Sequence, residues 1–236
     1  MFCISLFENK ISTLVKEVGR HILDAELMEI RVDGLYSRAF ELLPRHVENI
    51  MEAAGSKVRL LFTNRSRLEG GAFMGEDTER LAWLKICVEQ GADLVDVELN
   101  SPPFLRDELL HHAKKRGVQT VVSYHDLNGT PPIEELEDIF HAALALGPAI
   151  IKIVTTPNTP DDLVRIMGLY PHAGTHDARL IAFAMGETGR LTRLMSLYLG
   201  APFTYCAPAG RQGTAPGQLD MDTATEILKL LSIPSS

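Results

Sequence analysis

The chain has 236 residues, of which 45% are hydrophobic and 23% are charged, and this is the composition of a globular protein. The formal net charge of -8 argues against nucleic acid and anionic membranes as partners. Three cysteines without metal-ligand spacing, the absence of any apolar run near ~20 residues and the lack of a signal-peptide pattern predict a cytoplasmic protein with reduced thiols.

Short strand-like runs alternate with helical runs along the chain. The expected strand–helix pairs are, in chain order, 2–7 with 11–19, 25–32 with 40–54, 57–63 with 77–90, 92–99 with 104–116, 118–123 with 133–146, 149–154 with 159–168, 179–185 with 191–199, and 202–206 with 221–231. Eight such units predict an α/β protein with a single (β/α)8 TIM-barrel domain over 1–236. A doubly wound open sheet is the alternative, but no Gly-x-Gly-x-x-Gly motif supports a dinucleotide site.

The sixth expected strand places Lys152 among five apolar residues. A buried ammonium must find partners or give up its proton, and a neutral lysine can form a Schiff base with a ketone or aldehyde. The alternative is a lysine at a strand end whose amine reaches water. The other polar residues of the chain decide between these two interpretations.

Ionisable residues cluster where the expected strands end, which is where barrel active sites lie. Two-residue alternation puts Glu29, Arg31 and Asp33 on one strand face, and Asp96 with Glu98 on another. Further candidates are Arg65, Arg67 and Glu69 after the third strand, His125 and Asp126 after the fifth, and Glu187, Arg190 and Arg193 in a loop after the seventh.

Each of these residues also has a structural interpretation. Glu29 and Arg31 can form an ion pair, and Asp96 with Glu98 can serve as partners of basic residues. The segment from Arg65 to Glu69 can be a solvated loop that ends in a plain turn. Two histidines are expected on the surface and one cysteine as a buried filler, namely His111, His112 and Cys206.

Together these residue types allow one chemistry. An imine on Lys152 acidifies the adjacent C–H bond, and His125 can accept that proton near neutral pH. Glu69 can orient the imidazole, and arginines can hold a carboxylate or phosphate of the substrate. This describes a lyase or aldolase that needs no metal and no cofactor.

The motifs resemble those of type I 3-dehydroquinate dehydratase, the shikimate-pathway enzyme that converts 3-dehydroquinate to 3-dehydroshikimate. The resemblance covers nearly the whole chain. It rests on ordered motifs, namely Cys3-Ile4-Ser5-Leu6, Glu29-Ile30-Arg31-Val32-Asp33, Arg65-Ser66-Arg67-Leu68-Glu69-Gly70-Gly71, Ser123-Tyr124-His125-Asp126, Ile151-Lys152-Ile153, Met185-Gly186-Glu187 with Arg193, and Thr214-Ala215-Pro216-Gly217-Gln218.

The resemblance implies roles for these positions. Lys152 is the expected Schiff-base lysine, His125 the proton acceptor and donor, and Glu69 the carboxylate paired with His125. The loop over 208–218 is the expected lid. The positions that match substrate-binding residues are Ser5, Glu29, Arg31, Arg65, Arg193, Thr214 and Gln218, with Arg193 expected on the substrate carboxylate.

The chain departs from the family pattern at Thr214, where serine is usual, and it has no obvious N-terminal hairpin that plugs the barrel. The resemblance allows a homodimer. Two other functions are weighed against this one. A class I aldolase of a small anionic sugar or keto acid shares the barrel and the lysine and is the alternative. An inactive barrel that only binds a small carboxylate would need a catalytic residue to be missing, and none is.

Overall fold

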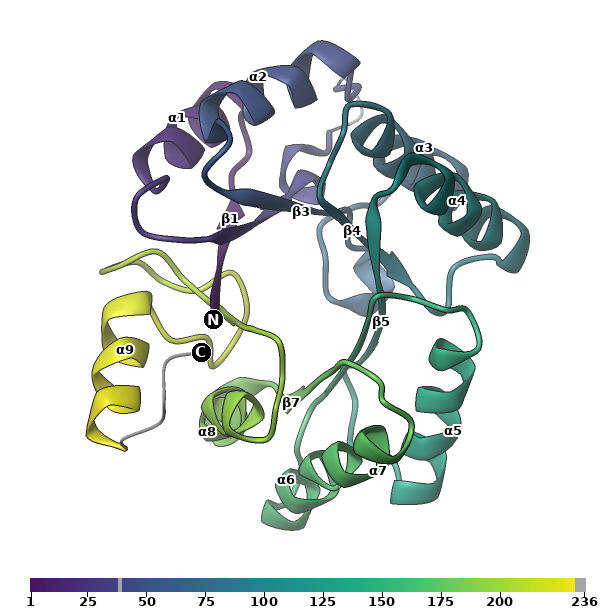
Figure 1. The fold of residues 1–236 in the computed structure, drawn as a ribbon, viewed down its shortest axis with the longest axis vertical. Helices are drawn as coiled ribbons and strands as arrows, with labels where there is room; N and C mark the ends of the chain where they lie inside the picture. The colour runs from purple at the N-terminus through teal and green to yellow at the C-terminus, as the bar shows by residue number, and fades with distance from the viewer. Residues whose placement is uncertain (38–39, 232–236) are drawn as a thin grey trace. The chain divides into compact units, whose positions relative to one another are not determined.

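Strands and helices alternate along the computed structural model, which describes residues 1–37 and 40–231; the colour ramp of Figure 1 follows this order. Within these residues the strands are β1 (Phe2–Phe7), β2 (Leu27–Arg31), β3 (Arg59–Thr63), β4 (Leu94–Glu98), β5 (Gln119–Asp126), β6 (Ile150–Thr155), β7 (Leu180–Ala184) and β8 (Thr204–Cys206). The α-helices of the same residues are α1 (Ile11–Arg20), α2 (Pro44–Ala54), α3 (Asp77–Glu89), α4 (Pro103–Arg116), α5 (Ile133–Leu144), α6 (Pro160–Met167), α7 (Leu169–Thr175), α8 (Gly186–Tyr198) and α9 (Met221–Leu230). No helix in the described part of the chain has the length and apolar content needed to cross a membrane.

The described strands form one sheet in which sequence neighbours lie side by side. The hydrogen-bonded order is β7-β6-β5-β4-β3-β2-β1-β8, so the last strand lies beside the first. The pairs β1 with β8, β2 with β3, β3 with β4, and β6 with β7 are parallel. This is the strand order of a (β/α)8 barrel, and it confirms the predicted fold class.

The chain packs as two compact units, which we describe separately. The N-terminal unit comprises residues 5–122, and the C-terminal unit comprises residues 1–4 with 123–236. Strands β2, β3 and β4 pair within the N-terminal unit, and strands β6 and β7 pair within the C-terminal unit. The prediction of a single domain over 1–236 stays a prediction, and positions 38–39 and 232–236 lie outside the described residues.

Several strands are buried along their full length, including their charged positions. All residues of β2, β4 and β6 are buried, as expected for parallel strands covered on both faces. Apolar side chains such as Ile30 and Val97 alternate with the charged ones, so the charged side chains share one face of each strand. The fold therefore carries glutamate, aspartate, arginine and lysine into the interior, where each needs a partner.

One helix was not predicted, and another was predicted with the wrong start. Helix α6 has nearly the predicted limits, but α7 follows directly after Gly168, which has helical angles, and was not predicted. The buried Tyr170 of α7 exchanges hydrogen bonds of 2.9 and 3.0 Å with the backbone of Ala182. Helix α8 begins at Gly186, so Glu187 and Arg190 form an ion pair on its first turns and do not lie in a loop. Gly189 packs closely within α8, because a side chain there would collide with the carbonyl of Ala184.

Candidate active site

Glu29 is buried and receives two hydroxyl hydrogen bonds in the N-terminal unit. The Ser5 hydroxyl donates to one carboxylate oxygen at 2.5 Å, and the Thr63 hydroxyl donates to the other at 2.8 Å. Glu29 is 4% exposed, so these donors replace the water that its carboxylate loses on folding. The structure therefore brings the predicted residues Ser5 and Glu29 into direct contact.

Arg31 pairs with Asp33, and not with Glu29 as one interpretation of the sequence expected. Its Nε and Nη2 atoms donate to the two oxygens of Asp33 at 2.8 and 2.7 Å, a bidentate pair. Burial lowers the pKa of Arg31, but the charge and hydrogen bonds of Asp33 outweigh this effect and raise it overall. Ala72 donates its backbone N–H to Asp33 at 3.0 Å, so the pair is tied to the loop after β3.

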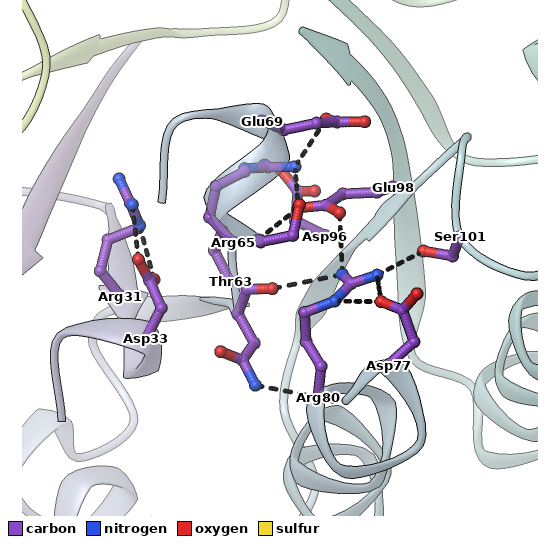
Figure 2. Close-up of polar contacts among 12 residues, drawn as sticks. Arg31, Asp33, Thr63, Arg65, Glu69, Asp77, Arg80, Asp96, Glu98 and Ser101 are labelled. Atoms are coloured by element: carbon purple, nitrogen blue, oxygen red, sulfur yellow. Dashed lines mark hydrogen bonds and ion pairs between the residues drawn. The ribbon is translucent and has the colours of Figure 1, made fainter. Parts of the chain in front are cut away.

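Arg65 contacts three buried carboxylates, as Figure 2 shows. Its Nη2 lies 2.6 Å from Asp96, and its Nη1 lies 3.2 Å from Glu98 and 3.5 Å from Glu69. These carboxylates raise the pKa of Arg65 although burial lowers it. The interpretation of Asp96 and Glu98 as structural partners of a basic residue is confirmed, whereas the solvated-loop interpretation of Arg65 was wrong because its side chain is 3% exposed.

Arg80 of α3 extends this cluster and was missed by the sequence analysis. Its Nη1 lies 3.0 Å from Glu98, and its Nε and Nη2 donate to Asp77 at 2.9 and 2.7 Å. Nη2 also donates to Ser101 at 2.9 Å, and the side chain is 2% exposed (Figure 2). The available signal was the three-residue spacing of Asp77 and Arg80 on one helix, which surface helices also show.

Glu69 is 6% exposed, and its pKa is raised to about 8. Burial is the largest cause and the charge of Glu98 the next, and both outweigh the opposing charge of Arg65. The carboxylates of Glu98 and Asp96 raise the pKa of Glu69 further, and the guanidinium groups of Arg65 and Arg80 lower it. Burial and the neighbouring carboxylates together favour the protonated form of Glu69.

The raised pKa of Glu69 predicts a pH-dependent stability that Glu69→Gln removes. The unfolded chain releases this proton near pH 4.5 but the folded chain holds it up to about pH 8. The stabilising contribution is therefore complete below pH 4.5 and is lost as the pH rises toward 8. Urea unfolding at pH 5 and pH 8 gives the measurement. Between these two pH values, the free energy of unfolding of wild type should fall by about 2 to 4 kcal/mol more than that of Glu69→Gln. The control Glu108→Gln, at an exposed site, should lose as much unfolding free energy between the two pH values as wild type does. An equal loss in all three proteins would contradict the raised pKa of Glu69.

Lys152 lies in β6 of the C-terminal unit with its side chain inside the fold. It is 5% exposed, and its Nζ lies 4.3 Å from the ring centroid of Tyr205 on β8. An ammonium at this distance from an aromatic face gains a cation–π interaction, and the neutral amine packs there as well. The alternative in which the lysine reaches water from a strand end was wrong.

His125 and Asp126 lie on β5 itself, whereas the sequence analysis ended this strand at residue 123. Both are half-buried. The Asp126 carboxylate accepts backbone N–H groups from Asn128 and Gly129 at 2.8 and 3.1 Å, so it closes the turn that follows the strand. This turn anchors the strand end that carries His125.

Arg193 of α8 is buried against an aromatic ring and the expected lid loop. Its guanidinium carbon lies 4.3 Å from the ring centroid of Phe183, and its Nη2 donates to the carbonyl of Pro216 at 3.2 Å. The backbone N–H of Gly186 donates to the same carbonyl at 3.2 Å. In this structure the loop over 208–218 is therefore docked on the N-terminal part of α8.

Thr214 and Gln218 contact each other within the same loop. The Gln218 side-chain oxygen accepts from the Thr214 backbone N–H at 2.6 Å and from its hydroxyl at 3.1 Å. Gly217, between them, has a φ of 74°, and a side chain there would collide with the carbonyl of Gly186. Thr214 thus supplies the hydroxyl that a serine would supply.

The structure also gives the positions of His111, His112 and Cys206. His111 is exposed, and His112, half-buried, lies 3.7 Å from Glu89 on the neighbouring α3. Cys206 is 1% exposed, and burial raises the pKa of its thiol to about 12. His111 lies on the surface and Cys206 is buried, as predicted, whereas His112 is only partly exposed.

A family model described as Type I 3-dehydroquinase matches residues 2–235. The chain belongs to the type I 3-dehydroquinase family. The match confirms the predicted family, and with it the prediction of an enzyme of the carbon–oxygen lyase class.

Relatives of this 3-dehydroquinase family member match along almost their full length. A 3-dehydroquinate dehydratase of Methanococcus maripaludis strain C6 is 32% identical over 98% of this chain and 100% of its own. The type I enzyme of Clostridium difficile, solved with covalently modified comenic acid, is 26% identical with a TM-score of 0.86 over 98% of this chain and 91% of its own. The enzyme of Geobacillus kaustophilus HTA426 is 26% identical with a TM-score of 0.87 over 100% and 92%.

Proposed function

We propose that this chain removes water from 3-dehydroquinate to give 3-dehydroshikimate, through an imine between the substrate ketone and Lys152. The observation that carries the proposal is a lysine 5% exposed on β6 of a chain that belongs to the type I family. A lysine is costly to bury, and a covalent role for its amine explains its position in an apolar strand. The family match also favours the dehydratase over the class I aldolase.

The proposed reaction balances without a cofactor. The amine of Lys152 adds to the ketone carbon and expels water, which leaves an imine that acidifies the neighbouring C–H bond. His125 takes that proton, and the resulting enamine expels the hydroxyl group on the next carbon, which leaves as water with a proton from His125. A water molecule then hydrolyses the imine, which releases the unsaturated ketone and frees the lysine.

Glu69 is proposed to orient the imidazole of His125 and to support its charged form. With a pKa of about 8, Glu69 is mostly protonated at neutral pH, so it would orient the imidazole through a hydrogen bond and would support the charged imidazolium only in its ionised form. The contacts of Arg65, Asp96 and Glu98 around it hold its position. Glu69 is therefore assigned here as a positioning residue for the proton transfers of His125.

Arg193 is proposed to bind the substrate carboxylate, and the loop over 208–218 to act as the lid. The contact of Arg193 with the Pro216 carbonyl supports this, because it couples the guanidinium to the loop that would close over a bound anion. We assign substrate-hydroxyl or carboxylate binding to the remaining predicted positions, namely Ser5, Glu29, Arg31, Arg65, Thr214 and Gln218. Their hydrogen bonds hold the donors and acceptors at fixed angles before substrate arrives.

The biological setting completes the proposal. The reaction belongs to the shikimate pathway and to aromatic amino acid biosynthesis, and we place it in the cytoplasm. The partner is the small molecule 3-dehydroquinate, with no role for nucleic acid or a membrane, and a homodimer is the proposed assembly.

A direct assay tests the activity. The product contains a conjugated enone and the substrate does not, so we expect ultraviolet absorbance to rise when purified protein is added to 3-dehydroquinate. The rise should be unchanged after treatment with a metal chelator, because no step uses a metal. No absorbance change at any protein concentration would refute the proposed function.

A further inference from the structure

Three histidines of the C-terminal unit lie close together on helices α5 and α7, which pack against each other (Figure 1). His141 lies in the last turn of α5, while His172 and His176 lie on and just after α7. One ring nitrogen from each lies within 4.8 Å of the other two. The Nε2 atoms of His141 and His172 are 3.1 Å apart.

The rings are held in place by their surroundings. The ring of Phe140, which is fully buried, lies 5.3 to 5.8 Å from the three imidazoles, measured between centroids. The Nδ1 atom of His172 lies 3.4 Å from the carboxylate of Glu137, one turn before His141 on α5. A carboxylate on one ring nitrogen fixes the tautomer and leaves the other nitrogen to bind a metal, which is the usual outer contact of a metal-binding histidine.

We propose that His141, His172 and His176 form a binding site for a divalent transition-metal ion of the Zn²⁺ class. Imidazole nitrogens bind Zn²⁺ at about 2.0–2.1 Å, so two ligands of a tetrahedral ion are ~3.3 Å apart. The distance of 3.1 Å between the Nε2 atoms of His141 and His172 matches this separation. The ring nitrogen of His176 lies within 4.8 Å of the other two, so a small rotation of this exposed ring brings it to the same separation. Three protein ligands leave the fourth position to water.

The site is distinct from the proposed catalytic residues. None of the three histidines belongs to the lysine, histidine and glutamate set assigned to the dehydration. His172 and His176 are four residues apart in the sequence, which is a weak signal for a metal site. Only the packing of α5 against α7 adds the third ligand. A bound ion would connect the two helices and should stabilise the folded chain.

Cobalt(II) is the probe because its tetrahedral complexes absorb strongly in the visible range and its octahedral complexes absorb weakly. We expect one equivalent of Co²⁺ to give the intense tetrahedral spectrum with wild type, and Zn²⁺ to displace it. His176→Ala and His141→Ala remove exposed side chains, so both variants should fold and lose the spectrum. His111→Ala, at an exposed histidine of α4, is the matched control and should bind as wild type does.

A second measurement separates a metal site from a plain hydrogen bond between imidazoles. Zn²⁺ should raise the melting temperature of wild type and of His111→Ala, but not that of His176→Ala. Glu137→Gln should weaken Zn²⁺ binding about tenfold, since it removes the carboxylate behind His172. If wild type shows only the weak octahedral spectrum, or if His176→Ala binds Co²⁺ as wild type does, the proposed site is wrong and the rings share only a hydrogen bond. Neither outcome depends on dehydratase activity.

Discussion

Lys152→Met should lower the turnover of 3-dehydroquinate by a factor on the order of 10⁴ or more, because it removes the amine that forms the imine. Methionine is the chosen replacement because it is close to lysine in length and is apolar. The side chain at this position is 5% exposed and packs on the ring of Tyr205, so an apolar residue of similar length should fill the same space. The free energy of unfolding should therefore change little, which separates lost chemistry from lost folding.

Borohydride trapping provides the measurement. It reduces an imine to a stable amine, so wild type incubated with 3-dehydroquinate and borohydride should gain the mass of one reduced adduct on Lys152. Lys152→Met should gain none. His125→Ala is the informative comparison, because it should still be trapped while turnover falls by about 10² to 10⁴, as expected for the loss of a general base.

Two outcomes would contradict this mechanism. Residual turnover of Lys152→Met within tenfold of wild type would exclude a covalent step at this lysine. Full turnover of His125→Ala would remove His125 from the proton transfers while leaving the imine intact.

Arg80→Met should destabilise the chain by about 3 to 5 kcal/mol, the largest effect on stability that we predict. Arg80 is 2% exposed and contacts the carboxylates of Glu98 and Asp77 and the hydroxyl of Ser101. Its removal takes one cation away from the buried carboxylate of Glu98. The cost arises because the Glu98 carboxylate stays buried without the positive charge of Arg80, and not from the lost contact alone.

Urea unfolding followed by circular dichroism measures this difference, with Arg59→Met as the control. Arg59 is exposed and donates one hydrogen bond to Gln119 at 2.9 Å, so its loss should cost less than about 1 kcal/mol. If Arg80→Met is no less stable than Arg59→Met, the desolvation cost of the Arg80 guanidinium offsets its contacts, and our account of the cluster fails.

The alternation of strands and helices could be predicted from the sequence because it depends on local periodicity. The β1 strand has the expected limits, and the others differ by a few residues at their ends. The larger errors concern α7, which was not predicted, and the start of α8. Gly168 has helical angles between α6 and α7, and Gly189 packs on Ala184 within α8. A glycine occurs at helix ends as well as within helices, so these residues do not define where a helix begins or ends.

The sequence by itself determined which residues face inward. Two-residue alternation placed Glu29 and Arg31 on one face of β2, and an apolar strand carried Lys152 into the interior. Only the tertiary structure decided which charges pair. Arg31 binds Asp33, Arg80 enters the Arg65 cluster from α3, and burial together with the charge of Glu98 raises the pKa of Glu69. The physical reason is that periodicity is a property of one segment, whereas a charge pair depends on the register and packing of several segments.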